Sequence, residues 1–302
     1  MIKQLSVKKM ICLFLICVLL PITLFMCAAR SPDTLTLHML DVGQGDSFLI
    51  VTPTGYTMLV DAGDPTQGGR VASYLKRQGV NRINHVIATH PHADHIGGME
   101  VILDRLPVDE LLMPPVVHTS QLFERLLLKA AATKTALNSV TKSAVLHAED
   151  DLTIQVLTTG YDYGDHLNDW SLIIYISHGG HSILMTGDAE SAAEAHMLEV
   201  FSPQVLNATI LKVGHHGSST STTQPFLNAV SPEIALISSG RDNRYGHPHE
   251  EVLSHLEAHN SWIYRTDLQG TVVIFSDGEK IWSHQAPYNL PSDVAPVKVK
   301  AQ

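Results

Sequence analysis

The sequence predicts a single α/β sandwich domain with mixed sheets. Short apolar runs typical of strands alternate with segments of helical periodicity, and connections of both hairpin and crossover length join them. Between residues 34 and 285 no linker is long enough to separate two domains. Because 44% of the 302 residues are hydrophobic and 17% are charged, the chain can bury a core, which excludes a disordered or fibrous protein.

Each predicted element rests on apolar periodicity and on the turn residues beside it, such as Gly43, Gly45 and Gly55 between the first strands and Gly79 after the first helix. In chain order we expect strands at 35–40, 47–52 and 57–60, a helix at 71–78, a strand at 85–88, a helix at 121–132, strands at 152–157, 171–177 and 182–185, a helix at 189–200, a strand at 208–213, a helix at 223–230, a strand at 234–238, a helix at 248–259, and strands at 262–265 and 271–275. The proline-containing segment 286–302 is predicted to be a flexible tail.

The first thirty residues have the composition of an export segment. Lys3, Lys8 and Lys9 precede an apolar run over 10–29, as in a signal peptide. The run also reaches the roughly 20 residues that a membrane anchor needs, and the lysines would keep its N-terminal side cytoplasmic. We therefore expect 1–30 to contact the membrane or the export machinery. The rest of the protein is then extracellular or on the cell surface, either secreted or anchored.

The rest of the chain is acidic and contains no cysteine. All three cysteines lie in the first thirty residues, which excludes a disulfide framework or a thiolate zinc site in the domain. Those residues also hold four basic side chains and no acidic one. The remaining chain therefore carries 16 basic and 30 acidic residues, a formal charge of −14, together with all 18 histidines. Any metal ion in the domain must be held by imidazole and carboxylate groups.

The stretch THPHADHIGG, which follows an apolar strand, concentrates potential metal ligands. In an extended segment residues two apart point the same way, so His90 and His92 can bind one ion. Asp94 and His95 lie where the chain turns and can face a second ion, and the glycine pair 97–98 allows a tight turn. This ligand chemistry suits zinc, manganese or iron, and a hydrated polar loop would make the ligand density a coincidence.

Three later sites supply further ligands at predicted strand ends. Asp188 follows the apolar run LMTG, although an Asp in this position is often only a turn or helix cap. A histidine pair, which includes His215, follows the strand at 208–213. His247 follows another strand and its loop. Because these sites share strand-end placement, together they predict a two-metal centre at one edge of the sheets.

The motif HxHxDH, with a later TGD, resembles the metallo-β-lactamase superfamily. The segments that resemble its ComEC-like branch, which includes the hydrolase domain of competence proteins, are LHMLDVGQGDSFLI (37–50), THPHADHIGG (89–98), LNDWSLIIY (167–175), LMTGDAE (184–190), KVGHHGSSTST (212–222) and YGHPHEEVL (245–253). The resemblance covers 34–285. It implies a four-layer αββα sandwich with a dinuclear metal site along one edge of the sheets.

The resemblance also implies roles for individual residues. His90 and His92 match ligands of the first metal; Asp94, His95 and His247 match ligands of the second; and Asp188 matches the carboxylate that bridges both. Asp61 matches a buried aspartate that orients ligands. His215 matches a ligand or a general acid, and we favour the acid.

One position departs from the pattern of many superfamily members. They place a histidine before the strand predicted at 171–177, where it completes the first metal site. Here the ComEC-like pattern gives Asn168 and Ser171 instead, with His166 close by. Either His166 reaches the metal, or the first site is more open and binds its ion more weakly or with water.

These residues predict a hydrolase with two divalent ions, zinc or manganese, whose bridging hydroxide attacks a phosphodiester. Asp94 would orient the hydroxide, and His215 or His247 would protonate the departing oxygen. The run 218–222, with Gly214 and Gly217, would supply amides and hydroxyls to phosphate, cap the next helix, or do both at once.

The formal charge of −14 disfavours an enzyme that binds long duplex DNA, because such binding depends on many contacts between basic side chains and phosphates. We expect single-stranded DNA or a small phosphodiester as the substrate, near a basic rim formed by Lys212, Arg241, Arg244 and Arg265. The alternatives are an amide, lactam or thioester hydrolase of the same fold, and a non-catalytic subunit of a DNA-uptake system.

Overall fold

A computed structural model describes residues 34–289 and 299–300. The predicted export segment over 1–30 lies outside the described residues. Among the residues that are described, no helix has the length and the apolar character needed to cross a bilayer.

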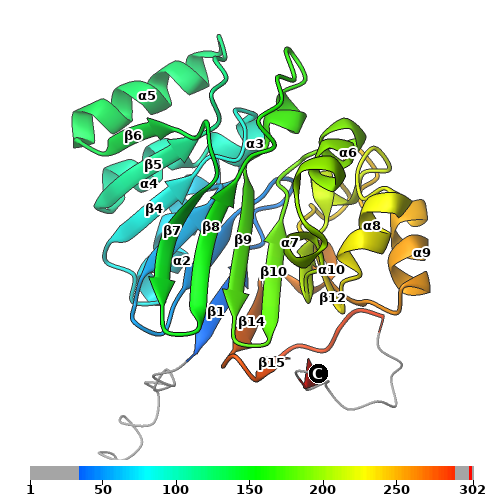
Figure 1. Cartoon of the computed structure of the whole chain (residues 1–302). Helices are drawn as coiled ribbons and strands as arrows, with labels where there is room; N and C mark the ends of the chain where they lie inside the picture. The colour runs from blue at the N-terminus through cyan, green and yellow to red at the C-terminus, as the bar shows by residue number, and fades with distance from the viewer. Residues whose placement is uncertain (1–33, 290–298, 301–302) are drawn as a thin grey trace, which may run out of the picture. The chain divides into compact units, whose positions relative to one another are not determined.

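Two mixed sheets form the centre of the domain (Figure 1). The described part of the first sheet contains, in spatial order, β16 (Val299–Lys300), β15 (Lys280–Ser283), β14 (Val272–Ser276), β1 (Leu35–Met39), β2 (Phe48–Val51), β3 (Thr57–Val60), β4 (Ile83–Ile87), β5 (Val108–Met113) and β6 (Ala136–Ser139). The second contains β13 (Trp262–Arg265), β12 (Ile234–Ile237), β11 (Ile210–Lys212), β10 (His181–Met185), β9 (Ile173–His178), β8 (Leu152–Leu157) and β7 (Ala144–Glu149).

Helices cover the outer face of each sheet, which gives four layers (Figure 1). The first sheet packs against α2 (Gly68–Arg77), α4 (Met99–Arg105) and α5 (Gln121–Thr133), and the second against α6 (Ser191–Val200), α8 (Gln224–Val230) and α9 (Glu250–Ala258). Shorter helical segments are α3 (Ala93–Ile96), η1 (Leu167–Trp170), α7 (Pro203–Leu206), η2 (Gly214–Gly217) and α10 (Thr266–Gln269). The predicted αββα sandwich is confirmed.

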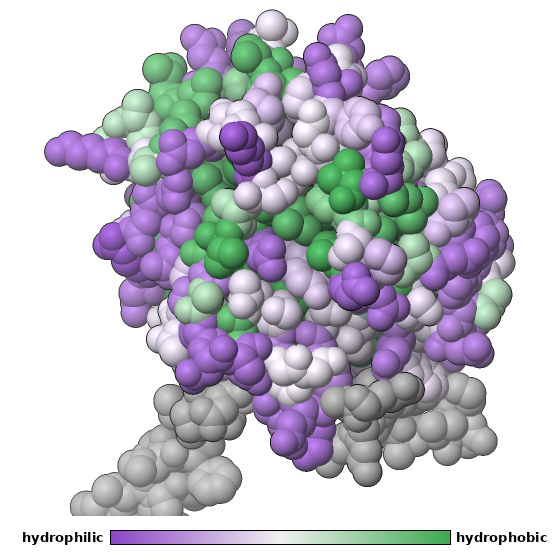
Figure 2. Space-filling model, in the orientation of Figure 1, coloured by the Kyte–Doolittle hydropathy of each residue, from purple (hydrophilic) through white to green (hydrophobic). Residues whose placement is uncertain are grey.

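Three apolar cores hold these layers together. Alternate residues of the strands, such as Met58 and Ile174, fill the space between the sheets with no exposed surface. The other faces pack against the helices, as Leu75 does in one outer core and Phe226 in the other. Large exposed apolar side chains are scattered over the described residues, such as Leu128 of α5 (63% exposed), and Figure 2 shows hydrophobic areas at several places on this face.

Several described elements differ from the sequence prediction. The helix α2 begins at Gly68, three residues early, and α4, β5, β6, β7 and β15 were not expected. The edge strand β6 is exposed at every position, so it lacks the alternation that would indicate a strand. The expected flexible tail begins with residues that contact the domain: the Tyr288 N–H donates to the Ile263 carbonyl. The domain therefore extends beyond residue 285.

Parallel strand pairs bring the ends of distant segments together. In the first sheet β3, β4 and β5 run parallel, and in the second β10, β11, β12 and β13 do. The carboxyl ends of parallel strands share one edge, where α/β folds commonly bind ligands. The segments after β3, β4, β10, β11 and β12 hold the predicted site residues.

The pair Gly97 and Gly98 is required by close packing and not by its backbone angles. Gly97 has φ −57° and Gly98 has φ −78°, which any residue adopts. A Cβ on Gly98, however, would lie 2.2 Å from the Ala62 carbonyl oxygen, and one on Gly97 would lie 2.4 Å from the Pro65 nitrogen. The helix α3 can thus pack directly against the chain that follows β3. The turning role expected from the sequence is wrong.

We predict that Gly98→Ala lowers the free energy of unfolding by about 1–3 kcal/mol, because the added methyl group forces the backbone apart. Denaturant unfolding measures this change. The matched control is Gly69→Ala in α2, whose Cβ would meet nothing closer than the Arg105 guanidinium at 3.6 Å. This control should leave stability unchanged or raise it by up to about 1 kcal/mol. Equal effects of the two substitutions would contradict the packing argument.

Candidate metal centre

The candidate site forms where five strand ends meet. His90 and His92 follow β4, α3 presents Asp94 and His95, Asp188 follows β10, His215 and His216 lie in η2 after β11, and His247 precedes α9. All of them except His90 and His95 line one cavity of about 320 Å³, together with Gln44, Ala93, Asn168 and Tyr245. His90 and His95 are fully buried directly behind it.

Asp61 fixes the first part of this site from beneath. Its carboxylate is buried and accepts hydrogen bonds from the Thr89 backbone N–H (2.9 Å) and the Thr89 hydroxyl (2.6 Å). The His95 Nδ1 lies 2.7 Å from the same carboxylate. Asp61 thereby joins the end of β3 to the chain after β4 and to α3. This is the orienting position that the sequence resemblance implied.

Hydrogen bonds at Nδ1 leave the Nε2 atoms of three buried histidines facing one another. The His216 Nδ1 lies 2.9 Å from the Ser238 carbonyl, which can only accept, so this nitrogen carries a proton. The His95 Nδ1 donates to Asp61, and the His90 Nδ1 lies 3.2 Å from the Thr89 hydroxyl, whose own proton goes to Asp61. Such partners orient histidine for metal binding through Nε2.

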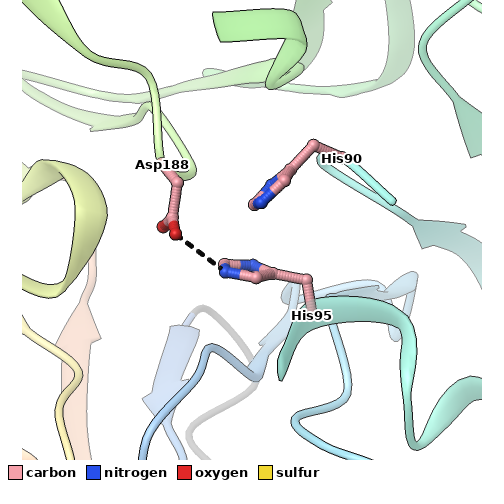
Figure 3. Close-up of side chains that lie close together, drawn as sticks. All are labelled: His90, His95 and Asp188. Carbon is pink, nitrogen blue, oxygen red and sulfur yellow. Dashed lines mark hydrogen bonds and ion pairs between the residues drawn. The ribbon is translucent and has the colours of Figure 1, made fainter. Parts of the chain in front are cut away.

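Asp188 is the point on which these imidazoles converge, and Figure 3 shows it with His90 and His95. Its Oδ2 lies 3.0 Å from the His95 Nε2 and 3.2 Å from the His216 Nε2. The Asp94 Oδ2 lies 3.5 Å from the same His216 nitrogen and 4.0 Å from that of His95. The His90 Nε2 lies 2.9 Å from the His92 Nδ1. The structure thus brings His90, His92, Asp94, His95 and Asp188 together.

Neighbouring charges raise the pKa values of the buried histidines His95 and His216 and lower those of the carboxyl groups Asp188 and Asp94. Burial opposes protonation of His95 and His216, but Asp188 and a second carboxylate outweigh burial and raise both pKa values well above the ordinary range. Burial alone would raise the pKa of Asp188, yet the two imidazolium groups hold it well below its usual range. Burial opposes ionisation of Asp94, but the neighbouring imidazoles of His216 and His95 together outweigh burial and lower the pKa of Asp94 to about 2.

Two successive residues after β11 adopt left-handed backbone angles. His215 has φ 45° and His216 has φ 56°, a conformation that is uncommon for non-glycine residues. The His216 ring is buried beside Asp188 and Asp94, while His215 stays partly exposed at the cavity. Such strain persists only where the surroundings hold it, and it is frequent at functional sites.

His215 faces the cavity with its orientation fixed by an acidic neighbour. Its Nδ1 lies 3.0 Å from the Glu190 Oε1, and its Nε2 lies 3.8 Å from the Asp188 Oδ2. His247 lies further out, with its ring centre 6.3 Å from that of His216, and its pKa is lowered to about 4 by burial and by His215. His216 therefore belongs to the closely spaced groups of the described residues, while His247 lines the cavity further out, and its role as a ligand of the second metal stays a prediction.

Lys212 is buried beneath the site and does not belong to a basic rim. It is 1% exposed, and its Nζ lies 2.5 Å from the Asp46 Oδ2 and 3.5 Å from the Asp188 Oδ1. Burial opposes its charge, but Asp46 and Asp188 outweigh burial and raise the pKa of Lys212. Arg265 is also not free, because it pairs with Asp267 at 2.7 Å. Of the expected rim residues, only Arg241 and Arg244 are exposed.

The run 218–222 is occupied with internal hydrogen bonds. The Ser221 hydroxyl donates to the Ala189 carbonyl, and the Thr220 hydroxyl donates to Glu190. The backbone N–H groups of Thr222 and Thr223, at the start of α8, donate to the buried carboxylate of Glu194. The start of α8 is thus capped by Glu194, and no side chain of the run 218–222 caps it, so the capping role expected for this run is wrong. The phosphate role stays a prediction.

The residues present fit a group of divalent ions. Sets of three side chains bring a ligand atom each within 4.8 Å of one another, namely His90, His95 and Asp188; Asp94, His95 and His216; and Asp46, Asp188 and His216. Buried polar atoms without a hydrogen bond include the His216 Nε2, the Asn168 Oδ1 and the His247 Nδ1. Imidazole and carboxylate are ligands of zinc, manganese and iron.

Three residues of the site were not assigned from the sequence. His216 was hidden by its neighbour His215, since sequence spacing does not tell which of two adjacent histidines turns inward. Asp46 lies in the loop between β1 and β2, and its Oδ1 is 3.2 Å from the His216 Nδ1. The burial of Lys212 could have been inferred from the sequence, because this residue is the last one of the short buried strand β11.

Comparison with known families identifies the fold. A model described as the metallo-beta-lactamase superfamily matches residues 40–241. The chain belongs to this superfamily. Its members are in general metal-dependent hydrolases, and the matched region contains every predicted site residue except His247.

The curated relatives match the ComEC-like branch of the superfamily. ComE operon protein 3 of Bacillus subtilis is 34% identical over 253 residues, which are 78% of this chain and 32% of that protein. Recombination protein 2 of Haemophilus influenzae is 32% identical over 84% of this chain and 30% of its own length. The chain thus spans about a third of these relatives. CmlA, a diiron beta-hydroxylase from Streptomyces venezuelae, shares the fold at 15% identity (TM-score 0.50; 78% of this chain, 53% of that one).

We predict that metal binding releases protons at pH 7. Because the pKa values of His95 and His216 lie well above 6.5, both imidazoles carry protons after a chelator has removed metal. Binding through Nε2 requires deprotonation, so about two protons should leave, and the apparent affinity should fall as the pH is lowered. Calorimetric titration at pH 7 in buffers of different ionisation enthalpy counts the protons. A binding enthalpy that is the same in all of these buffers would mean that no protons are released and would contradict the prediction.

Proposed function

We propose that this protein is a metal-dependent phosphodiesterase that acts on single-stranded DNA or on a small phosphodiester. The observation that carries the proposal is the convergence of imidazoles on Asp188 and Asp94 at the base of a cavity of about 320 Å³, with His215 at its wall. Two similar proteins, Recombination protein 2 of Haemophilus influenzae and Competence protein ComA of Neisseria gonorrhoeae, carry names that favour a nucleic acid among phosphodiesters.

Bound divalent ions would supply Lewis acidity and a hydroxide nucleophile at neutral pH. His90, His92, Asp94, His95, Asp188 and His216 are the residues that would hold them. With a pKa of about 2, Asp94 is ionised at neutral pH, and it is partly exposed to the cavity. Its carboxylate can therefore accept a hydrogen bond from the attacking water and orient it.

His215 is the group best placed to donate a proton to the leaving oxygen. Glu190 lies 3.0 Å from its Nδ1, which directs Nε2 towards the cavity. A base or acid held by a third group in this way is the usual arrangement in hydrolases. This geometry supports the acid role over the ligand role for His215.

The charge of the cavity favours a short or flexible substrate. Arg244 is exposed beside the site, and its guanidinium lies 4.8 Å from the centre of the Tyr245 ring, which lines the cavity. A cation and an aromatic ring can contact a phosphate and a base of a single strand. Duplex DNA requires many such contacts, and the acidic domain offers few.

We also propose that the protein acts outside the cytoplasm, because the predicted export segment over 1–30 supports this location. Fractionation of cells that express the full chain tests it, and recovery of the protein only in the cytoplasm would contradict it.

The proposed activity is tested with purified protein loaded with Mn²⁺ or Zn²⁺. We expect cleavage of single-stranded DNA or of bis-p-nitrophenyl phosphate, and we expect Asp188→Asn to abolish both cleavage and tight metal binding, since His95 and His216 would lose their shared partner. Turnover of nitrocefin alone would favour the amide or lactam hydrolase instead. Tight DNA binding without turnover, unchanged in Asp188→Asn, would favour a non-catalytic subunit.

We predict that His215→Ala lowers kcat about 10²–10⁴-fold on a substrate with a poor leaving group, because proton donation is lost. The loss should be much smaller with p-nitrophenolate, which leaves without a proton. Metal content should stay at the wild-type value. His166→Ala is the matched control, since His166 is exposed and does not line the cavity. Loss of bound metal in His215→Ala would instead make His215 a ligand.

A further inference from the structure

The first metal position has two imidazoles and the bridging carboxylate of Asp188, and it lacks an assigned fourth protein ligand. His90 and His92 approach each other to 2.9 Å, and the histidine that many superfamily members add before the next strand is absent. His166, the alternative considered from the sequence, is exposed and outside the cavity lining. The remaining candidate near this position is Asn168.

Asn168 presents an unpaired oxygen to the site. It lies in η1 and lines the same cavity as His92 and Asp188. Its Oδ1 is buried and makes no hydrogen bond. A buried carbonyl oxygen without a donor is costly unless a ligand satisfies it.

Glu190 fixes which end of the amide faces the site. The Asn168 Nδ2 lies 3.3 Å from the Glu190 Oε1, and a carboxylate can only accept, so the amide nitrogen must point to Glu190. The oxygen is then directed away from it. Glu190 is itself held, because its Oε1 accepts from the Thr220 hydroxyl at 2.9 Å and its backbone N–H donates to Asp169 at 2.9 Å.

We propose that Asn168, through Oδ1, is the fourth protein ligand of the first metal position, beside His90, His92 and Asp188. Glu190 is the residue that positions it. An amide oxygen is a harder ligand than imidazole, so this position should favour Mn²⁺ relative to Zn²⁺ more than three imidazoles would. The inference rests on the proposed function only in requiring that the cavity binds divalent ions. It concerns the metal and not the substrate.

The test is metal titration of the full chain without substrate, by calorimetry and by elemental analysis of bound Mn²⁺ and Zn²⁺. Asn168→Ala should weaken binding of one of the two ions about tenfold or more. Asn168→His, which restores the imidazole, should raise the ratio of Zn²⁺ to Mn²⁺ affinity about tenfold or more. Glu190→Gln should lower the affinity for the same ion by less than Asn168→Ala does, since a glutamine can face Asn168 with either end of its amide.

Matched measurements separate a ligand role from a merely structural one. His166→Ala should bind both ions as the wild type does, and thermal unfolding after chelation should show that each variant is folded. Unchanged affinities and an unchanged Zn²⁺ to Mn²⁺ ratio in folded Asn168→Ala or Asn168→His would overturn the inference alone. If wild-type protein bound neither ion, the inference and the proposed function would both fail. Should Asn168→Ala not fold, Asn168→His and Glu190→Gln decide.

Discussion

The hydrogen bonds to the buried Asp61 carboxylate determine where the other groups of the site can lie. They tie Thr89 and His95 to the end of β3, so His95 can reach Asp188 from the opposite sheet. From there carboxylates and bases alternate in an unbroken path: Asp61, His95, Asp188, His216, Asp46 and Lys212, with successive polar atoms 2.7, 3.0, 3.2, 3.2 and 2.5 Å apart. Each charged group is satisfied by neighbours of opposite sign, which is the condition under which charges are tolerated in a protein interior.

The two sheets contribute different parts of this path. The first sheet supplies Asp61 and the cluster after β4, while the second supplies Asp188 and His216 from adjacent parallel strands. The core between the sheets fixes their separation. Close contacts at Gly97 and Gly98 fix the position of α3 against the chain that follows β3. The precision of the site is therefore a property of packing in the whole domain, since no single loop contains enough ligands.

The fold and most ligand positions could be predicted from the sequence because they depend on local patterns. Strand-end histidines and carboxylates mark the site, and apolar periodicity marks the layers. The edge strands β6 and β7 escaped prediction because exposure on both faces removes the alternation. The inward turn of His216 and the burial of Lys212 depend on backbone angles and on partners distant in the sequence. The internal bonding of the run 218–222 depends on Glu194 from another helix in the same way.

The Asp46–Lys212 pair has a consequence for the charge of the site. Buried charges are costly unless groups of opposite charge compensate them. Here the chain supplies a cation of its own beneath the site, because Lys212 is 1% exposed and its Nζ lies 2.5 Å from Asp46 and 3.5 Å from Asp188. Part of the carboxylate charge is therefore compensated by the chain itself, and this part does not depend on a bound ion.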